Sequence, residues 1–235
     1  MLDIGRIRTL RGRNIWAERP VIEFTLTLGD APRPSAGLMD RLAHWTSDFS
    51  AGSGRWTPPT ADTTPADTTL ASTLAHLTLA LQTQAGCQVA FWDTRPAESQ
   101  GQTAGVYQVA CEYDEPAVAL ACLDSARALL VAALRDEAFD VASDTARLRA
   151  LCQDLHLGPS TSAIARAAQA RGIPVQRLGR DNLLLLGQGV RQRRVWTAET
   201  DRTGAIAEAI AQDKDLTRLL LGSVGVPVPE GRPVA

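Results

Sequence analysis

Lysine is almost absent from this sequence: Lys214 stands alone beside 23 arginines in 235 residues. A lysine kept where arginine fills every other basic position suggests a task for a compact, flexible ammonium, such as holding a nucleotide phosphate.

Basic clusters with interleaved aromatic residues are also missing, so we expect no nucleic-acid partner. The charge is uneven, with 13 Arg against 19 acidic residues in 1–158 and 11 basic against 7 acidic residues in 159–235, which favours an anionic ligand for the second segment.

Signals for export, membrane insertion and metal binding are lacking as well. The N-terminus has no apolar segment with a small-residue cleavage site, so we expect a cytoplasmic protein. The most apolar stretch, 117–134, contains Asp124 and Arg127, which favours a buried core helix and no membrane role. No C-x-x-C spacing occurs, and the cysteines are interpreted as buried thiols in a reducing compartment rather than as a disulfide or zinc set: Cys87, Cys111, Cys122 and Cys152.

Residues for nucleophilic hydrolysis are not arranged in any known pattern. His44 and His156 lie far apart without an acidic residue at compatible spacing, and no serine stands in a G-x-S-x-G turn. No catalytic residue is therefore assigned. The tryptophans are scattered along the chain, so packing in the core or in loops is their expected role.

Hydrophobic periodicity predicts an α+β fold for the first part of the chain, with helices covering a mostly antiparallel sheet. Leu70, Leu74, Leu77 and Leu81 lie on one face of a predicted helix that ends near Gly86. The predicted order is strands at 3–9 and 21–28, a helix at 36–49, a long loop at 51–69, a helix at 70–83, strands at 89–92 and 105–113, and helices at 116–135 and 141–156.

A break at Leu157-Gly158-Pro159 separates a predicted domain at 1–158 from a second segment at 159–235. Ser160 or Thr161 is predicted to cap a helix that runs through Ala170. The elements predicted beyond it are strands at 175–178, 183–186 and 193–198, helices at 203–211 and 213–222, and the approach to another strand at 226–235.

Three stretches together resemble the cyanophycin synthetases, bacterial enzymes that polymerise aspartate and arginine into a storage polypeptide. The first is RTLRGRNIW at 8–16, although that family more often has proline at the position of Arg13. The second comprises LGPST at 157–161, RGIP at 171–174 and LGQGVRQRR at 186–194. The third comprises TDRT at 200–203, Asp213-Lys214 and GVPVP at 225–229. The resemblance covers both ends well and residues 35–70 poorly.

This resemblance implies that residues 159–235 are a linker helix followed by the incomplete N-terminal part of an ATP-grasp-type α/β domain. In that family, ATP phosphorylates a carboxylate and an amine attacks the acyl phosphate. Lys214 matches the early ATP-grasp lysine that reaches nucleotide phosphates; the alternative is an ordinary exposed helix lysine. ATP and Mg²⁺ are thus implied for a parent enzyme, and we expect neither to bind tightly to this chain alone.

Many members of that family carry an H-x-x-E-H pattern on the helix that matches 70–83, and this pattern can hold zinc for peptide hydrolysis. Here the three positions are Ser72, Ala75 and His76, so only one of the three groups remains. We expect no metal site there and interpret His76 as an ordinary residue on the polar face of the helix. A stand-alone metallopeptidase is the least favoured hypothesis.

Two further patterns have ordinary structural interpretations. Gly187-Gln188-Gly189 lacks the spacing of a phosphate-binding loop and is predicted to be a hairpin turn. Arg191, Arg193 and Arg194 alternate along a strand and either face a nucleotide or an acidic polymer or form a solvated sheet face.

Two hypotheses for function follow. In the first, the chain is the N-terminal part of a cyanophycin synthetase-like ligase and is non-catalytic alone. In the second, it is a polymer-binding or scaffold module with a degenerate metallopeptidase site, which binds cyanophycin or packs as a homo-oligomer. Under the first hypothesis, we also expect uncovered apolar surface around residues 200–235.

Overall fold

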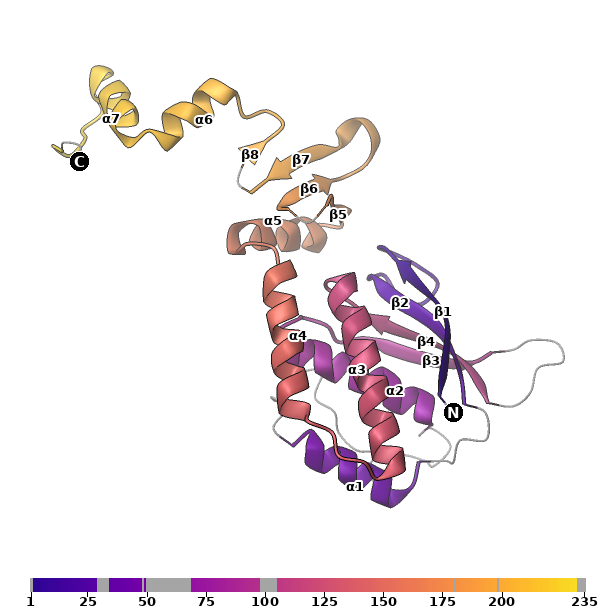
Figure 1. The fold of residues 1–235 in the computed structure, drawn as a ribbon. Coiled ribbons are helices and arrows are strands. Elements are labelled where there is room, and N and C mark those ends of the chain that lie inside the picture. The colour runs from indigo at the N-terminus through magenta and orange to yellow at the C-terminus, as the bar shows by residue number, and fades with distance from the viewer. Residues whose placement is uncertain are drawn as a thin grey trace. The chain divides into compact units, whose positions relative to one another are not determined.

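The structure is a computed structural model that describes residues 2–28, 34–47, 49, 69–97, 105–179, 181–197 and 199–231. The predicted loop at 51–69 lies outside these residues up to position 68. The chain divides into two compact units, Met1–His156 and Leu157–Ala235. Each unit contains a four-stranded antiparallel sheet together with helices, so the predicted α+β class is confirmed (Figure 1).

The first unit has a sheet in the order β1-β2-β4-β3, in which all neighbouring strands are antiparallel. Its helices gather on one face of this sheet (Figure 1). The elements are β1 Asp3–Leu10, β2 Val21–Thr27, α1 Ala36–Trp45, α2 Leu70–Ala85, β3 Trp92–Pro96, β4 Val106–Glu112, α3 Pro116–Arg135 and α4 Val141–Leu155. The predicted succession of two strands, two helices, two strands and two helices is thereby confirmed.

Alternation along β2 positions the core of this unit. Ile22, Phe24 and Leu26 point toward the helices and are almost completely buried. Helix α2 belongs to the same core and is buried along nearly its whole length, because it packs against α3, α4 and β4. Burial of each large apolar side chain contributes about 1.5–3 kcal/mol, so this core contributes substantially to the stability of the unit.

Helix α3 has the length and apolar composition of a membrane span, and it is the one such helix among the described residues. More than half of its apolar window is nevertheless buried inside the unit. Val118, Cys122, Leu123 and Leu130 have no exposed surface. The prediction of a buried core helix over 117–134 is thus confirmed.

The third strand of the first unit runs from Trp92 to Pro96, later than the predicted range 89–92. The reason is a carboxylate from the neighbouring strand: Glu112 Oε2 accepts the backbone N–H groups of Ala90 and Phe91, at 2.8 and 2.9 Å. These amides are satisfied by a side chain instead of a ladder partner, so regular pairing begins only afterwards.

The second unit begins with α5 Pro159–Ala170, followed by a meander in the order β5-β6-β7-β8. The predicted cap by Ser160 or Thr161 is wrong, because Gly158 is the N-cap and Pro159 occupies the first helical position, which suits its fixed φ. The remaining elements are β5 Val175–Arg177, β6 Leu183–Leu186, a 3₁₀ turn Gly189–Arg191, β7 Arg193–Trp196, β8 Glu199–Thr200, α6 Ala205–Gln212 and α7 Lys214–Ser223. The sequence pattern does not predict the short strand β8.

Helices α6 and α7 contain no buried residue, although both are amphipathic. Ile206, Leu219 and Val224 are at least two-thirds exposed. The small core of this unit instead lies between α5 and the sheet, at Ala165, Leu184 and Val195. The prediction of uncovered apolar surface around 200–235 is therefore confirmed for the described residues.

Candidate functional site

Lys214 is the first residue of α7, immediately after the residue that caps the helix. The Asp213 carboxylate accepts the backbone N–H groups of Asp215 and Leu216, both at 3.0 Å. An aspartate at this position satisfies helix donors that have no intrahelical partner, which explains why α7 begins here. The cap holds the backbone of Lys214 in place, while its side chain extends into solvent.

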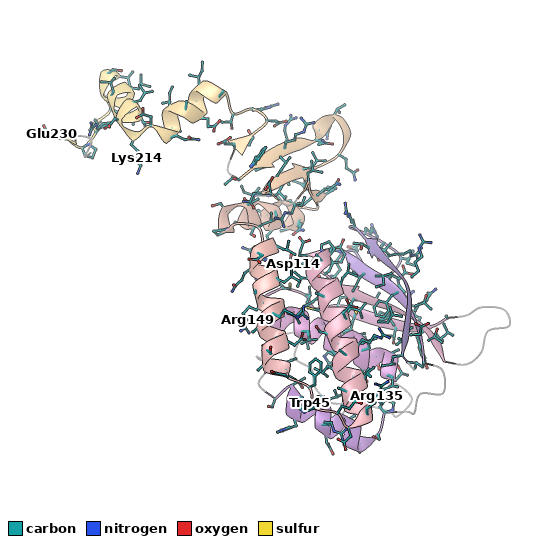
Figure 2. The ribbon with its side chains drawn as sticks, in the orientation of Figure 1. Trp45, Asp114, Arg135, Arg149, Lys214 and Glu230 are labelled. Atoms are coloured by element: carbon teal, nitrogen blue, oxygen red, sulfur yellow. The ribbon has the colours of Figure 1, made fainter. Side chains whose placement is uncertain are left out.

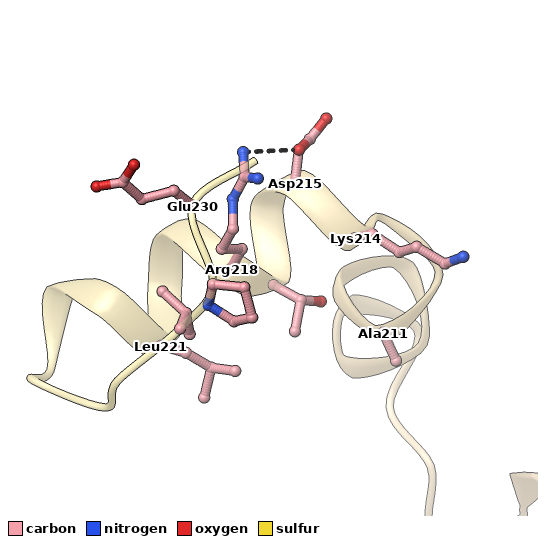
Figure 3. Close-up of a pocket in the computed structure, with 9 residues that line it drawn as sticks. Ala211, Lys214, Asp215, Arg218, Leu221 and Glu230 are labelled. Atoms are coloured by element: carbon pink, nitrogen blue, oxygen red, sulfur yellow. Dashed lines mark hydrogen bonds and ion pairs between the residues drawn. The ribbon is translucent and has the colours of Figure 1, made fainter. Parts of the chain in front are cut away.

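A shallow groove of about 370 Å³ runs beside Lys214 along α7. Leu221, Val228 and Pro229 give it an apolar wall, and Glu230 lies at its rim. Figure 2 shows that Lys214 and Glu230 both belong to this C-terminal part of the chain. In the close-up of Figure 3, the Lys214 ammonium points away from Arg218 and Glu230, although Lys214 also lines the groove.

The charges around Lys214 decide what it can bind. Arg218 is paired with Asp215 at 3.0 Å, and the salt bridges found within the described ranges do not include Lys214. Its ammonium is therefore available for an anion. Asp213 and Asp215 flank it, however, and Asp213 already occupies the first-turn amides that a phosphate would use at a helix N-terminus. These residues fit one contact to a phosphate group and do not by themselves form a nucleotide site.

On helix α2, two of the three positions that correspond to the H-x-x-E-H pattern have a structural role. Ser72 forms a reciprocal capping box with Thr69: its N–H donates to Thr69 Oγ1, and its Oγ accepts the Thr69 N–H. Ala75 has no exposed surface. His76 is partly buried and stacks on Trp92 at 5.7 Å between ring centroids. The expectation of a polar helix face is wrong, because α2 packs between the sheet, α3 and α4.

Metal-binding groups do not come together in the part of the chain that the structure describes, where no set of three His, Cys, Asp or Glu side chains has a suitable arrangement. At the other two positions of the H-x-x-E-H pattern, Ser72 and Ala75 supply neither an imidazole nor a carboxylate.

The loop between β6 and β7 is a hairpin connection, as predicted for Gly187-Gln188-Gly189. Gly187 and Gly189 both have positive φ, at 80° and 55°, which explains the need for glycine. The Gly187 amide is not available to a phosphate, because it donates to Pro174 O.

Strand β7 separates buried from exposed side chains. Val195 and its partner Leu184 are buried against α5, whereas Arg194 and Trp196 belong to the opposite face. Trp196 is 56% exposed, so the expectation that it packs in a core or loop is wrong. Its exposure follows from the alternation of side chains along the strand, because its neighbour Val195 is buried. Arg191, Arg193 and Arg194 are all exposed, as a solvated face requires.

No family model matches the chain. Among curated proteins, it is 33% identical to the cyanophycin synthetases of Trichormus variabilis and of Nostoc sp., and 30% identical to that of Geminocystis herdmanii. Each comparison covers 98% of this chain. The chain is a relative of the cyanophycin synthetases. It spans 26–27% of the length of these relatives. The resemblance inferred from three short stretches is confirmed, and it extends to the middle of the chain, where those stretches give little support.

Proposed function

We propose that this chain acts as the N-terminal part of a cyanophycin synthetase-like ligase, which uses ATP and Mg²⁺ to polymerise aspartate and arginine. One observation carries the proposal: similarity to several cyanophycin synthetases runs along 98% of the chain. In this account Met1–His156 is the N-terminal domain, and Leu157–Ala235 holds a linker helix and the opening of an ATP-grasp domain.

Within this function, Lys214 is the residue that contacts a nucleotide phosphate. Its ammonium is exposed and outside the salt bridges of the described residues, which supports the assignment. ATP supplies the phosphoryl group that activates a carboxylate for attack by an amine. The contribution of Lys214 is to neutralise and position phosphate charge, the kind of interaction on which phosphoryl transfer depends.

The chain on its own is proposed to be non-catalytic, because a phosphate contact from one ammonium does not make a ligase site. Purified chain incubated with ATP, Mg²⁺, aspartate, labelled arginine and a cyanophycin primer is expected to release no ADP and to incorporate no arginine. The same mixture with a complete curated relative serves as the positive control. Stoichiometric, ATP-dependent incorporation by the chain alone would overturn this part of the proposal.

A second candidate function, binding of the polymer, is favoured by the exposed face of β7. Arg194 can pair with carboxylates, and Trp196 offers an exposed ring on which guanidinium groups stack. Cyanophycin carries both groups at high density. In this function the second unit would hold the polymer while bonds are made elsewhere, and both functions can belong to the same protein.

We expect cyanophycin binding to weaken steadily as salt increases, because contacts between exposed charges are screened. The double substitution Arg194→Ala with Trp196→Ala is expected to weaken binding about 10-fold, the scale of one ion pair and one cation–π contact. Lys214→Ala is the matched control and should leave binding unchanged. Co-sedimentation with cyanophycin granules measures all three. A polymer site on β7 would be contradicted if binding does not change with salt concentration. It would also be contradicted if Lys214→Ala weakens binding as much as the double substitution does.

A further inference from the structure

Two cysteines that are 65 residues apart in the sequence lie side by side in the first unit. Cys87 follows Gly86, which ends α2 in a left-handed conformation, and Cys152 lies in the last turn of α4. Their sulfur atoms are 3.6 Å apart, and both thiols are in the reduced state. The packing of α2 against α4 creates this pair, so its proximity is a property of the fold.

The other two cysteines have different surroundings. Cys111 and Cys122 have no exposed surface, and burial raises the pKa of both thiols far above the usual range. The Cys111 thiol also donates to the carbonyl of Ala75. Both side chains are therefore protonated and shielded, which makes them poor nucleophiles.

The pair Cys87 and Cys152 lies at the rim of the core instead. Each retains 4% exposure, and exposed residues flank both of them, namely Gly86, Gln88, Gln153 and His156. A small oxidant can reach such a position more readily than the interior.

The environment of Cys152 also favours its thiolate. The pKa of Cys152 is lowered to about 7, chiefly by its hydrogen bond with Cys87 and also by the adjacent His156, whereas burial opposes the shift. The pKa of Cys87 is raised, chiefly by its hydrogen bond with Cys152 and then by burial. The pair thus combines Cys152, which readily forms a thiolate, with the protonated thiol of Cys87 within contact distance.

We propose that Cys87 and Cys152 are a redox modification site, which forms an intramolecular disulfide when a small hydroperoxide oxidises the protein. The Cys152 thiolate attacks one oxygen of hydrogen peroxide, the O–O bond breaks, and the leaving hydroxide takes a proton to become water. The product is a sulfenic acid on Cys152. Oxidation removes the Cys152 thiolate that favoured the proton on Cys87. The Cys87 sulfur then attacks the sulfenic sulfur, the S–O bond breaks, and the Cys87 proton leaves with the hydroxide as a second water. Two thiols lose two electrons and two protons in total, and one peroxide is reduced to two waters.

The geometry suits the second step. The sulfur atoms need to approach from 3.6 Å to a bond length of about 2.05 Å, which side-chain rotation can supply. The bond joins the end of α2 to the end of α4 and closes a long loop. Because such a cross-link restricts the unfolded chain, the oxidised first unit is expected to melt about 5–10 °C above the reduced one.

The test uses the full 235-residue chain, which is treated with a slight excess of hydrogen peroxide and then with a thiol-alkylating reagent. Digestion with trypsin and a glutamate-specific protease places the four cysteines on four different peptides. Mass spectrometry under non-reducing conditions is expected to show peptide 150–166 linked to the peptide that contains Cys87. Cys111 and Cys122 should carry alkyl groups only. Addition of dithiothreitol should release the link and return the melting temperature to its starting value.

Two variants separate this proposal from general oxidation. The double variant Cys111→Ala with Cys122→Ala keeps the pair and should form the link as fast as the parent chain. Cys87→Ala removes the hydrogen bond that lowers the pKa of Cys152, so oxidation of Cys152 is expected to be slower. The sulfenic acid that forms should persist long enough to be trapped by dimedone, with no rise in melting temperature. A link from Cys152 to Cys122, or four fully alkylated cysteines in peroxide-treated parent chain, would overturn the proposal without any variant.

Discussion

Replacing Ala75 with glutamate is expected to lower the free energy of unfolding of the first unit by about 3–5 kcal/mol, the range found for an uncompensated buried charge. Ala75 has no exposed surface and lies on the helix at the centre of the core. The Cys111 thiol touches this position but already donates to the Ala75 carbonyl, so it offers no hydrogen bond to a new carboxylate. Urea denaturation followed by circular dichroism measures the loss.

The control is the same substitution at Ala146, an exposed position in the middle of α4. Ala146→Glu should change stability by less than about 0.5 kcal/mol, as is usual for surface positions. Equal stability of the Ala75→Glu and Ala146→Glu variants would show that the environment of α2 has been misjudged. The comparison bears on function, because restoring an H-x-x-E-H pattern requires Ala75→Glu together with Ser72→His. We expect the chain with both substitutions to lose its fold before it gains a zinc site.

Replacing Lys214 with alanine in a ligase that carries this chain is expected to lower the rate of arginine incorporation about 100-fold, the effect of removing one charged contact to a transition state. The suitable protein is a hybrid in which the chain replaces the aligned quarter of the Trichormus variabilis relative. Lys214→Arg keeps the charge but not the shape of the ammonium, so partial activity is expected. The measurement is the rate of labelled arginine incorporation at varied ATP concentration.

Arg166→Ala provides the matched control for Lys214→Ala. Arg166 is also an exposed cation on a helix of the second unit, but it lies on α5 and outside the motif shared with the family. Its loss should leave incorporation within about 2-fold of the hybrid, as expected for an isolated surface charge. If both variants behave alike, Lys214 is an ordinary exposed helix lysine and the phosphate contact must come from another residue.

The fold is predictable wherever one face of an element is apolar and the other is not. Strand β2, with Ile22, Phe24 and Leu26 at alternate positions, and the long apolar helix α3 are clear from periodicity alone. The start of strand β3 is not predictable in this way, because the Glu112 carboxylate binds the amides of residues 90 and 91, a contact between distant positions that no local pattern encodes.

Recognition of the candidate site depends on composition and on short motifs. The scarcity of lysine singles out Lys214, but its surroundings are not predictable, since they depend on how Asp213 caps α7 and how Asp215 captures Arg218. The exposure of Trp196 is deducible in principle from its alternation with Val195. The contact between Cys87 and Cys152 is not, because 65 residues separate them and only the packing of α2 on α4 brings them together.

The central claim is that this chain can serve as the front part of a cyanophycin-polymerising ligase, and the hybrid enzyme tests it most directly. The measurement is primer-dependent incorporation of labelled arginine by the purified hybrid, with and without ATP and with and without aspartate. We predict incorporation that requires both ATP and aspartate and exceeds that of the Lys214→Ala hybrid. A hybrid that matches the parent enzyme in circular dichroism and assembly size, yet incorporates no arginine, would contradict the claim.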